Sequence, residues 1–132
     1  MSIEAATVNL EYLAQQLIPL VGVVQAQAVV DTLIERARQD RRWGEQNHDP
    51  FVYGAVLVEE VGEFMQAALK ARFESFPAGA RGVHQALADR MREEAVQVAA
   101  VALAIVECLD RDRWPWGSAA LPDPERDSEV RA

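Results

Sequence analysis

The chain has 132 residues, of which half are hydrophobic, so it can bury one core but is short for two domains. Its formal net charge of -8 argues against a protein that wraps nucleic acid through its phosphates. The single cysteine, Cys108, excludes an intrachain disulfide, and we find neither a signal peptide nor an apolar run long enough to span a membrane. These features predict a soluble, cytoplasmic protein.

The first half of the chain has helical hydrophobic periodicity, and no segment shows the strict alternation of a half-buried strand. The pattern predicts a short helix over residues 10–20, ended by Pro19 and Gly22. A second helix is predicted over residues 23–42, with arginines in its last turns, where they suit a helix C-terminus. Residues 43–48 form a polar connector.

The second half begins with a helix start signal, because Asp49 can cap a helix and Pro50 suits its first position. The third helix is predicted to run to about Phe73, and a loop with proline and glycine leads to a fourth over residues 84–110. The sequence therefore predicts one all-α domain over residues 1–113. Residues 114–132 hold three of the six prolines and many charges, which predicts a flexible tail.

Three glutamates stand in the apolar third helix, within the stretch EEVGE at residues 59–63. At about 100° per residue, Val52, Val56 and Ala67 lie on the same side as the acids, while a wide apolar face lies opposite. This pattern is typical of a helix buried on both sides. The alternative is a solvated helix whose glutamates form ion pairs.

The fourth helix also has polar side chains in apolar surroundings. Gln97 is the one polar side chain in the run AVQVAAVALAIV, and it lies one turn from Glu94. Each of the pairs Glu60/Glu63 and Glu94/Gln97 is spaced i, i+3, so each pair projects two oxygens in one direction. Buried carboxylates must take up protons or bind a cation. If the two helices pack antiparallel, the four oxygens suit Mg2+ or Mn2+.

The pattern EVGE, a loop and then EAVQ resembles the ExxE, loop, ExxD signature of the MazG-like all-α nucleoside triphosphate pyrophosphohydrolases, a superfamily that includes the dimeric dUTPases. The resemblance covers about residues 41–113, from RRWGEQNHDPFVYGAVLVEEVGE to REEAVQVAAVALAIVECLDR. It implies a four-helix-bundle-like domain completed in a homodimer or tetramer. It also implies Mg2+-dependent cleavage of a nucleoside triphosphate substrate to a monophosphate and pyrophosphate.

Carried over by position, the resemblance implies four metal ligands, Glu60, Glu63, Glu94 and Gln97. Glu59 would be a further ligand or the base that orients the attacking water, and its role is not separable from that of Glu60. Gln97 departs from the pattern, which has aspartate there, because an amide oxygen can coordinate a cation but brings no charge.

Further polar and aromatic residues are candidates for binding the substrate. An indole can stack on a base, amides can read its edge, and basic side chains can hold phosphates. The alternatives are a core tryptophan and ordinary surface charges. The predicted substrate-binding residues are Trp43, Gln46, Asn47, Lys70, Arg92 and Arg111.

Two other functions compete with this interpretation. A helical nucleotide-binding or interaction module that has lost turnover is favoured by Gln97. A di-iron carboxylate bundle is disfavoured, because neither acidic motif contains the Glu-x-x-His that such sites use.

Overall fold

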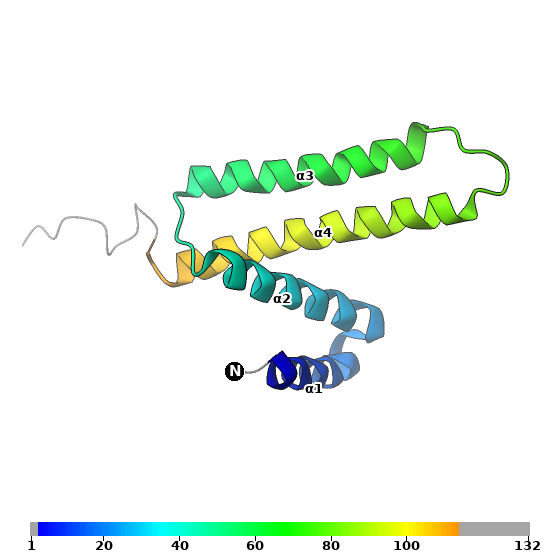
Figure 1. The fold of residues 1–132 in the computed structure, drawn as a ribbon. Helices are drawn as coiled ribbons and strands as arrows, with labels where there is room; N and C mark the ends of the chain where they lie inside the picture. Colours follow the sequence, from blue (N-terminus) through cyan, green and yellow to red (C-terminus); the bar gives the residue numbers. More distant parts are fainter. Residues whose placement is uncertain (1–2, 114–132) are drawn as a thin grey trace, which may run out of the picture.

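The computed structural model describes the backbone of residues 3–113 and the side chains of residues 9–113. Four helices make up this part of the chain: α1 (Ile3–Val21), α2 (Val23–Trp43), α3 (Pro50–Phe73) and α4 (Arg81–Asp110) (Figure 1). Residues 3–113 contain no strand, so the predicted all-α fold is confirmed. The predicted tail at residues 114–132 lies outside the described residues.

The start of α3 is as predicted. The Asp49 carboxylate accepts a hydrogen bond of 2.7 Å from the Phe51 backbone N–H, and Pro50 occupies the first helical position. This arrangement satisfies one of the unpaired N–H groups of the first turn, and the proline adds none. Gly44, with φ +73°, ends α2 six residues earlier and lets the chain turn into the connector.

Two helix starts differ from the prediction. The first helix begins at Ile3 and runs through Pro19 to Val21, so Pro19 does not end it. A proline in the last turn removes only one backbone hydrogen bond, and Gly22, with φ +85°, provides the break instead. The last helix begins at Arg81, three residues before the predicted start.

The helices are arranged around α4. Figure 1 shows α3 and α4 as an antiparallel hairpin joined by the loop at residues 74–80, with α2 packed on α4 and α1 packed on α2. The helix α4 therefore has neighbours on two sides, whereas α3 packs only on α4 among the four described helices.

The face of α3 that packs on α4 is the acidic one. Tyr53 and Ala67 are buried, and Glu60 lies midway between them at seven-residue spacing, which is the repeat of a helix–helix seam. The sequence predicted burial on both sides of this helix. Within the single chain only the acidic side is covered, because Val58 and Met65 on the opposite apolar face are exposed.

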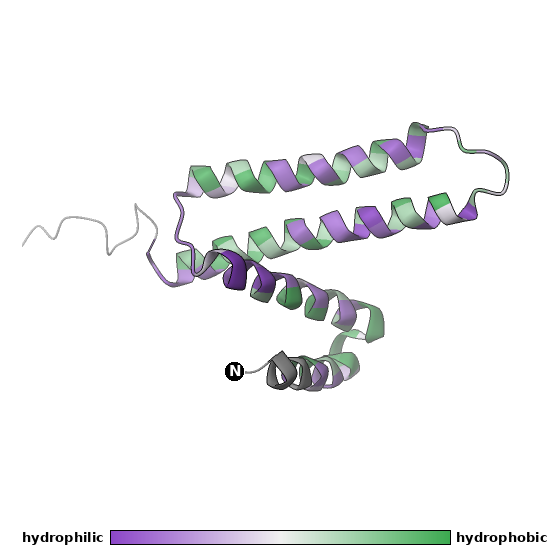
Figure 2. Ribbon diagram, in the orientation of Figure 1, coloured by the Kyte–Doolittle hydropathy of each residue, from purple (hydrophilic) through white to green (hydrophobic). Residues whose placement is uncertain are grey.

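A buried hydrophobic cluster lies near the C-terminal end of α4, where Tyr53 packs with Ala104, Ile105 and Cys108. Figure 2 shows this part of α4 as hydrophobic. Cys108 is 1% exposed, so the thiol is a core group. None of the helices in the described part of the chain combines the length and the hydropathy needed to cross a bilayer.

Candidate metal centre

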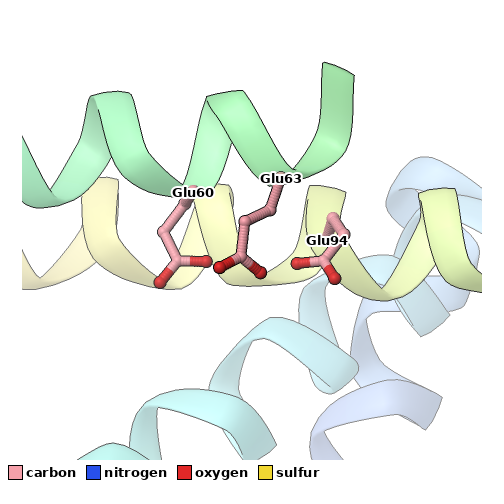
Figure 3. A group of neighbouring side chains, drawn as sticks. All are labelled: Glu60, Glu63 and Glu94. Atoms are coloured by element: carbon pink, nitrogen blue, oxygen red, sulfur yellow. The ribbon is translucent and has the colours of Figure 1, made fainter. Parts of the chain in front are cut away.

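Three of the four predicted metal ligands come together between α3 and α4. Oxygens of Glu60, Glu63 and Glu94 lie within 4.8 Å of one another, and Figure 3 shows their carboxyl groups side by side. Glu94 is buried at 3% exposure, Glu60 is half-buried and Glu63 is exposed. We call these three residues the acidic trio. It forms because α3 and α4 have acidic residues at facing positions, where two packed helices usually have hydrophobic ones.

Repulsion and burial both act on the acidic trio. Burial raises the pKa of Glu60, and the negative charges of Glu63 and Glu94 raise it further. Burial also raises the pKa of Glu94, and this effect outweighs the lowering by the nearby Arg90 guanidinium. The three carboxylates therefore favour a cation or a proton among them.

Arg90 is the cation that touches the acidic trio. Its guanidinium forms an ion pair with Glu94, lies 3.8 Å from Glu63 and also reaches Glu93 at 3.5 Å. The side chain is 55% exposed, so it approaches the acids from the solvent side. One arginine thus serves several carboxylates, and its pairs with the exposed Glu63 and Glu93 contribute little stability.

The fourth predicted ligand, Gln97, has a protein partner. Its side-chain oxygen accepts a hydrogen bond of 3.4 Å from the Gln39 amide, which comes from α2. The same Gln39 nitrogen donates to the carboxylate of Glu35, also at 3.4 Å. Gln97 therefore connects the α3–α4 hairpin to polar groups on α2.

A pocket of about 110 Å³ adjoins the acidic trio. Its walls include Glu60 and Gln97 together with Trp43 and Gln46, two of the predicted substrate-binding residues. The Gln46 carbonyl accepts a 2.8 Å hydrogen bond from the buried Tyr53 hydroxyl, so the connector is fixed to α3. We call it the base pocket, because Trp43 and Gln46 are the residues predicted to bind a base, and it brings an aromatic ring, amide groups and the acids together.

A second pocket, of about 420 Å³, lies on the other side of the acidic trio. Glu63, Lys70 and Arg90 are among the residues that line it. The Lys70 amine lies 3.9 Å from Glu74, a weak and exposed pair. We call this the basic pocket, because it offers two cationic side chains next to Glu63.

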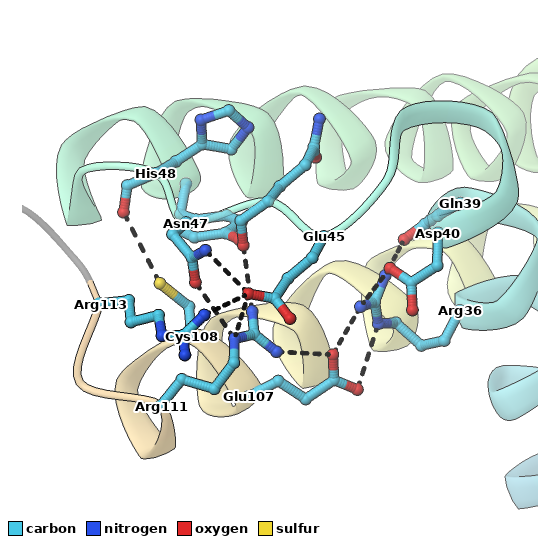
Figure 4. A network of polar contacts seen from close by, with 12 residues as sticks. Arg36, Gln39, Asp40, Glu45, Asn47, His48, Glu107, Cys108, Arg111 and Arg113 are labelled. Atoms are coloured by element: carbon cyan, nitrogen blue, oxygen red, sulfur yellow. Dashed lines mark hydrogen bonds and ion pairs between the residues drawn. The ribbon is translucent and has the colours of Figure 1, made fainter.

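The remaining predicted substrate-binding residues lie elsewhere. Arg92 forms a 2.5 Å ion pair with Asp31 across α2 and α4. Arg111 donates to the Asn47 side chain at 3.1 Å and to the Gln46 carbonyl at the same distance, within the network of Figure 4. The structure does not bring Arg92, Arg111 or Asn47 to the acidic trio. Glu59 lies one turn before Glu63 on α3 and is exposed.

Two buried charged residues were missed in the sequence. Glu35 and Arg36 are each 8% exposed, although they begin the highly charged run ERARQDRR at the end of α2. That run is typical of a solvated helix end, and only its position directly after the apolar Leu33 and Ile34 signals otherwise.

Comparison with protein-family models, with curated proteins and with solved structures found no significant match to this chain.

Proposed function

We propose that this protein is a Mg2+-dependent nucleoside triphosphate pyrophosphohydrolase that cleaves between the α and β phosphates. The convergence of Glu60, Glu63 and Glu94 carries the proposal, because their negative charges meet in a partly buried place with one exposed arginine as counter-charge. The resemblance of EVGE and EAVQ to the MazG-like signature names the reaction.

The acidic trio suits a hard divalent cation. All three donors are carboxylate oxygens, the type that Mg2+ and Mn2+ prefer. The three oxygens lie within 4.8 Å of one another. Glu60, Glu63 and Glu94 would hold the ion, and Arg90 would have to leave Glu94.

The two pockets give the substrate a direction along α3. The base pocket adjoins Glu60, so the base would stack on Trp43 and meet the amide of Gln46. The basic pocket adjoins Glu63, so the β and γ phosphates would lie near Lys70 and the released Arg90. The α phosphate then lies over the acidic trio, at the bond to be cleaved.

The chemistry is the attack of water on the α phosphorus. The bound cation would supply charge neutralisation and activation of the water. Glu59 is one turn from Glu63 on the same side of α3, and it accepts the proton of the water as the new bond forms. The bond from the α phosphorus to the bridging oxygen breaks, and pyrophosphate leaves to the side of Lys70 and Arg90.

A catalytically weak nucleotide-binding module is the second candidate. It is favoured by Gln97, whose side-chain oxygen accepts from Gln39 and brings no charge to the site. Under this function the protein binds the nucleotide and the cation, and turnover is very slow or absent.

A homodimer or a tetramer belongs to the proposal. Several large hydrophobic side chains are exposed on the outer face of α3, and a second copy of the chain would cover them. They include Val58, Val61, Met65 and Leu69. A monomeric mass by light scattering, at concentrations up to those used for the enzyme assay, would contradict this part.

The proposal is tested with a panel of canonical and modified nucleoside triphosphates, assayed for pyrophosphate with and without Mg2+. We expect metal-dependent pyrophosphate release with at least one of them, and its loss in Glu63→Ala. Asp110→Ala is the matched control, because it removes an exposed acid at the far end of α4. If a nucleotide binds but no pyrophosphate is released, the catalytically weak nucleotide-binding module is favoured. If the panel gives neither, both candidates fail.

A further inference from the structure

Glu35 on α2 is a buried carboxylate whose partners compensate it poorly. It is 8% exposed and, with Glu94, one of the two buried acids among the described side chains. It accepts from Arg38, whose side chain is 70% exposed, at 2.9 Å and from the Gln39 amide at 3.4 Å. Burying a carboxylate is costly unless it is well paired, and an exposed arginine one turn away is a weak partner. A further role for the charge would explain its burial.

The position of Glu35 relative to the proposed site is fixed by Gln39. One nitrogen of Gln39 donates to both Glu35 and Gln97, so the two acceptor oxygens share one donor. Glu35 and Gln97 also line one cavity of about 440 Å³ between α2 and α4. The carboxylate from α2 therefore lies beside the one predicted ligand that has no charge.

The pockets on either side of Gln97 point the same way. Gln97 lines the base pocket together with Glu60, and it lines the cavity of about 440 Å³ together with Glu35. Seen from the proposed site, α3 and α4 supply three carboxylates, and α2 supplies one more next to Gln97.

We propose that Glu35 provides, from α2, the fourth negative charge that Gln97 does not bring to the cation site. This inference rests on the proposed function. Glu35 is a positioning residue, which acts through Gln39 and Gln97 and increases the affinity of the acidic trio for a divalent cation. The lack of charge on the Gln97 side chain is then compensated within the chain.

The test is a calorimetric titration of the full chain with Mn2+ alone. In Glu35→Gln we expect the affinity to fall by about 10-fold or more, which is typical of the loss of an outer partner of a metal site. Asp89→Asn is the matched control, because Asp89 is exposed, lines the same cavity and pairs with Gln85. This variant should bind Mn2+ within about 2-fold of the unchanged protein, as surface changes usually have small effects.

Rescue separates charge from structure. The double variant Glu35→Gln and Gln97→Asp loses the carboxylate at position 35 and gains one at position 97, on the facing helix. Its Mn2+ affinity should recover. A merely structural role of Glu35 would not be rescued, so a double variant as weak as Glu35→Gln would overturn the inference. Glu35→Asp keeps the negative charge but shortens the side chain by one methylene group, which moves the carboxylate away from Gln39. It provides a second measurement if Glu35→Gln does not fold, and an unchanged affinity in it would also overturn the inference.

The outcomes for this inference and for the proposed function are distinct. If the unchanged protein binds Mn2+, Glu63→Gln abolishes the binding and Glu35→Gln behaves like Asp89→Asn, then the inference fails and the proposed cation site stands. If the unchanged protein does not bind Mn2+ at all, both fail. Unfolding midpoints measured without Mn2+ show which variants are folded.

Discussion

Two charged clusters lie along α4, and they differ in how their charges are balanced. At the C-terminal end, three carboxylates face three arginines in the network of Figure 4, which consists of Asp40, Glu45, Glu107, Arg36, Arg111 and Arg113. In the middle of the helix, the acidic trio and Glu93 share Arg90. We call the first cluster the arginine network.

The difference teaches that burial alone does not mark a functional site. Arg36 is as buried as Glu35, yet it has Asp40 at 3.0 Å and Glu107 at 2.5 Å, so its charge is used within the fold. The acidic trio keeps a surplus of negative charge that the fold does not neutralise. Surplus charge of this kind is a cost to stability that a ligand can offset.

The largest effect is expected in the arginine network. Arg36→Met leaves Glu107 and Asp40 without their shared partner, and we expect the free energy of unfolding to fall by about 1–3 kcal/mol. Urea denaturation measures it. The control Arg41→Met changes an exposed arginine of the same helix and should stay within about 0.5 kcal/mol. Equal losses in the two variants would show that the network is not structural.

The next effect concerns Gln97. Gln97→Asp adds a fourth carboxylate to the hairpin itself, and we expect Mn2+ to bind about 10-fold more tightly, a gain of about 1.4 kcal/mol. Pyrophosphate release should rise with it. Gln85→Glu adds the same charge at an exposed position near the start of α4 and should change neither. A weaker affinity in Gln97→Asp would mean that position 97 does not face the cation.

Removal of one carboxylate should change the stability in opposite directions in the two clusters. Glu60→Gln removes one of several like charges, so we expect the metal-free protein to become more stable by about 0.2–1 kcal/mol. Glu107→Gln should instead lower the stability, because it removes a partner of Arg36. Thermal unfolding with and without Mg2+ measures both. In Glu60→Gln the added stability from Mg2+ should also disappear, and a Mg2+ effect of full size would contradict the site.

The pH dependence of stability should differ in direction between the clusters. The pKa of Glu60 is raised above the usual 4.5. The folded state therefore binds more protons than the unfolded one between 4.5 and the raised pKa, and stability falls as pH rises through this window. The hydrogen bond from the Asn47 amide, and then the charges of Arg111 and Arg113, lower the pKa of Glu45. Its contribution is therefore present above 4.5 and is lost as pH falls.

Free energies of unfolding measured from about pH 3 to about pH 7 separate the two slopes. Glu60→Gln should reduce the decline above pH 4.5, and Glu45→Gln should reduce the loss below it. Addition of Mg2+ near neutral pH should offset the decline in the unchanged protein. A decline that survives in Glu60→Gln would place its origin outside the acidic trio.

Much of the fold could be predicted because local signals agree with it. The cap at Asp49 and the glycines at positions 22 and 44 are local features, and the two ends of α2 and the start of α3 follow from them. The packing side of α3 could not be predicted in the same way. Its apolar face and its acidic face are both compatible with burial, and only contact with α4 selects the acidic one.

The acidic trio could be predicted from local features. Glu60 and Glu63 are spaced i, i+3 on one helix, and Glu94 lies on the next helix, which folds back against the first. Glu35 could not be predicted, because its burial depends on how α2 crosses α4. Arg111 and Asn47 illustrate the same limit from the other direction. They were predicted near the substrate, but Arg111 donates hydrogen bonds to Asn47 and to the Gln46 carbonyl in the connector, more than sixty positions away in the chain.

The topology has a consequence for the order of folding. The acidic trio belongs to an antiparallel hairpin closed by a short loop, whereas Glu35 and Trp43 reach the site through contacts such as Asp31 with Arg92, 61 residues apart. Short-range contacts form first, since they cost less loop entropy. We expect the hairpin to assemble with its acids still hydrated, and α2 to desolvate them only on docking. The cost of burying the like charges would then arise late in folding, after the main barrier. A divalent cation would therefore slow unfolding more than it speeds folding.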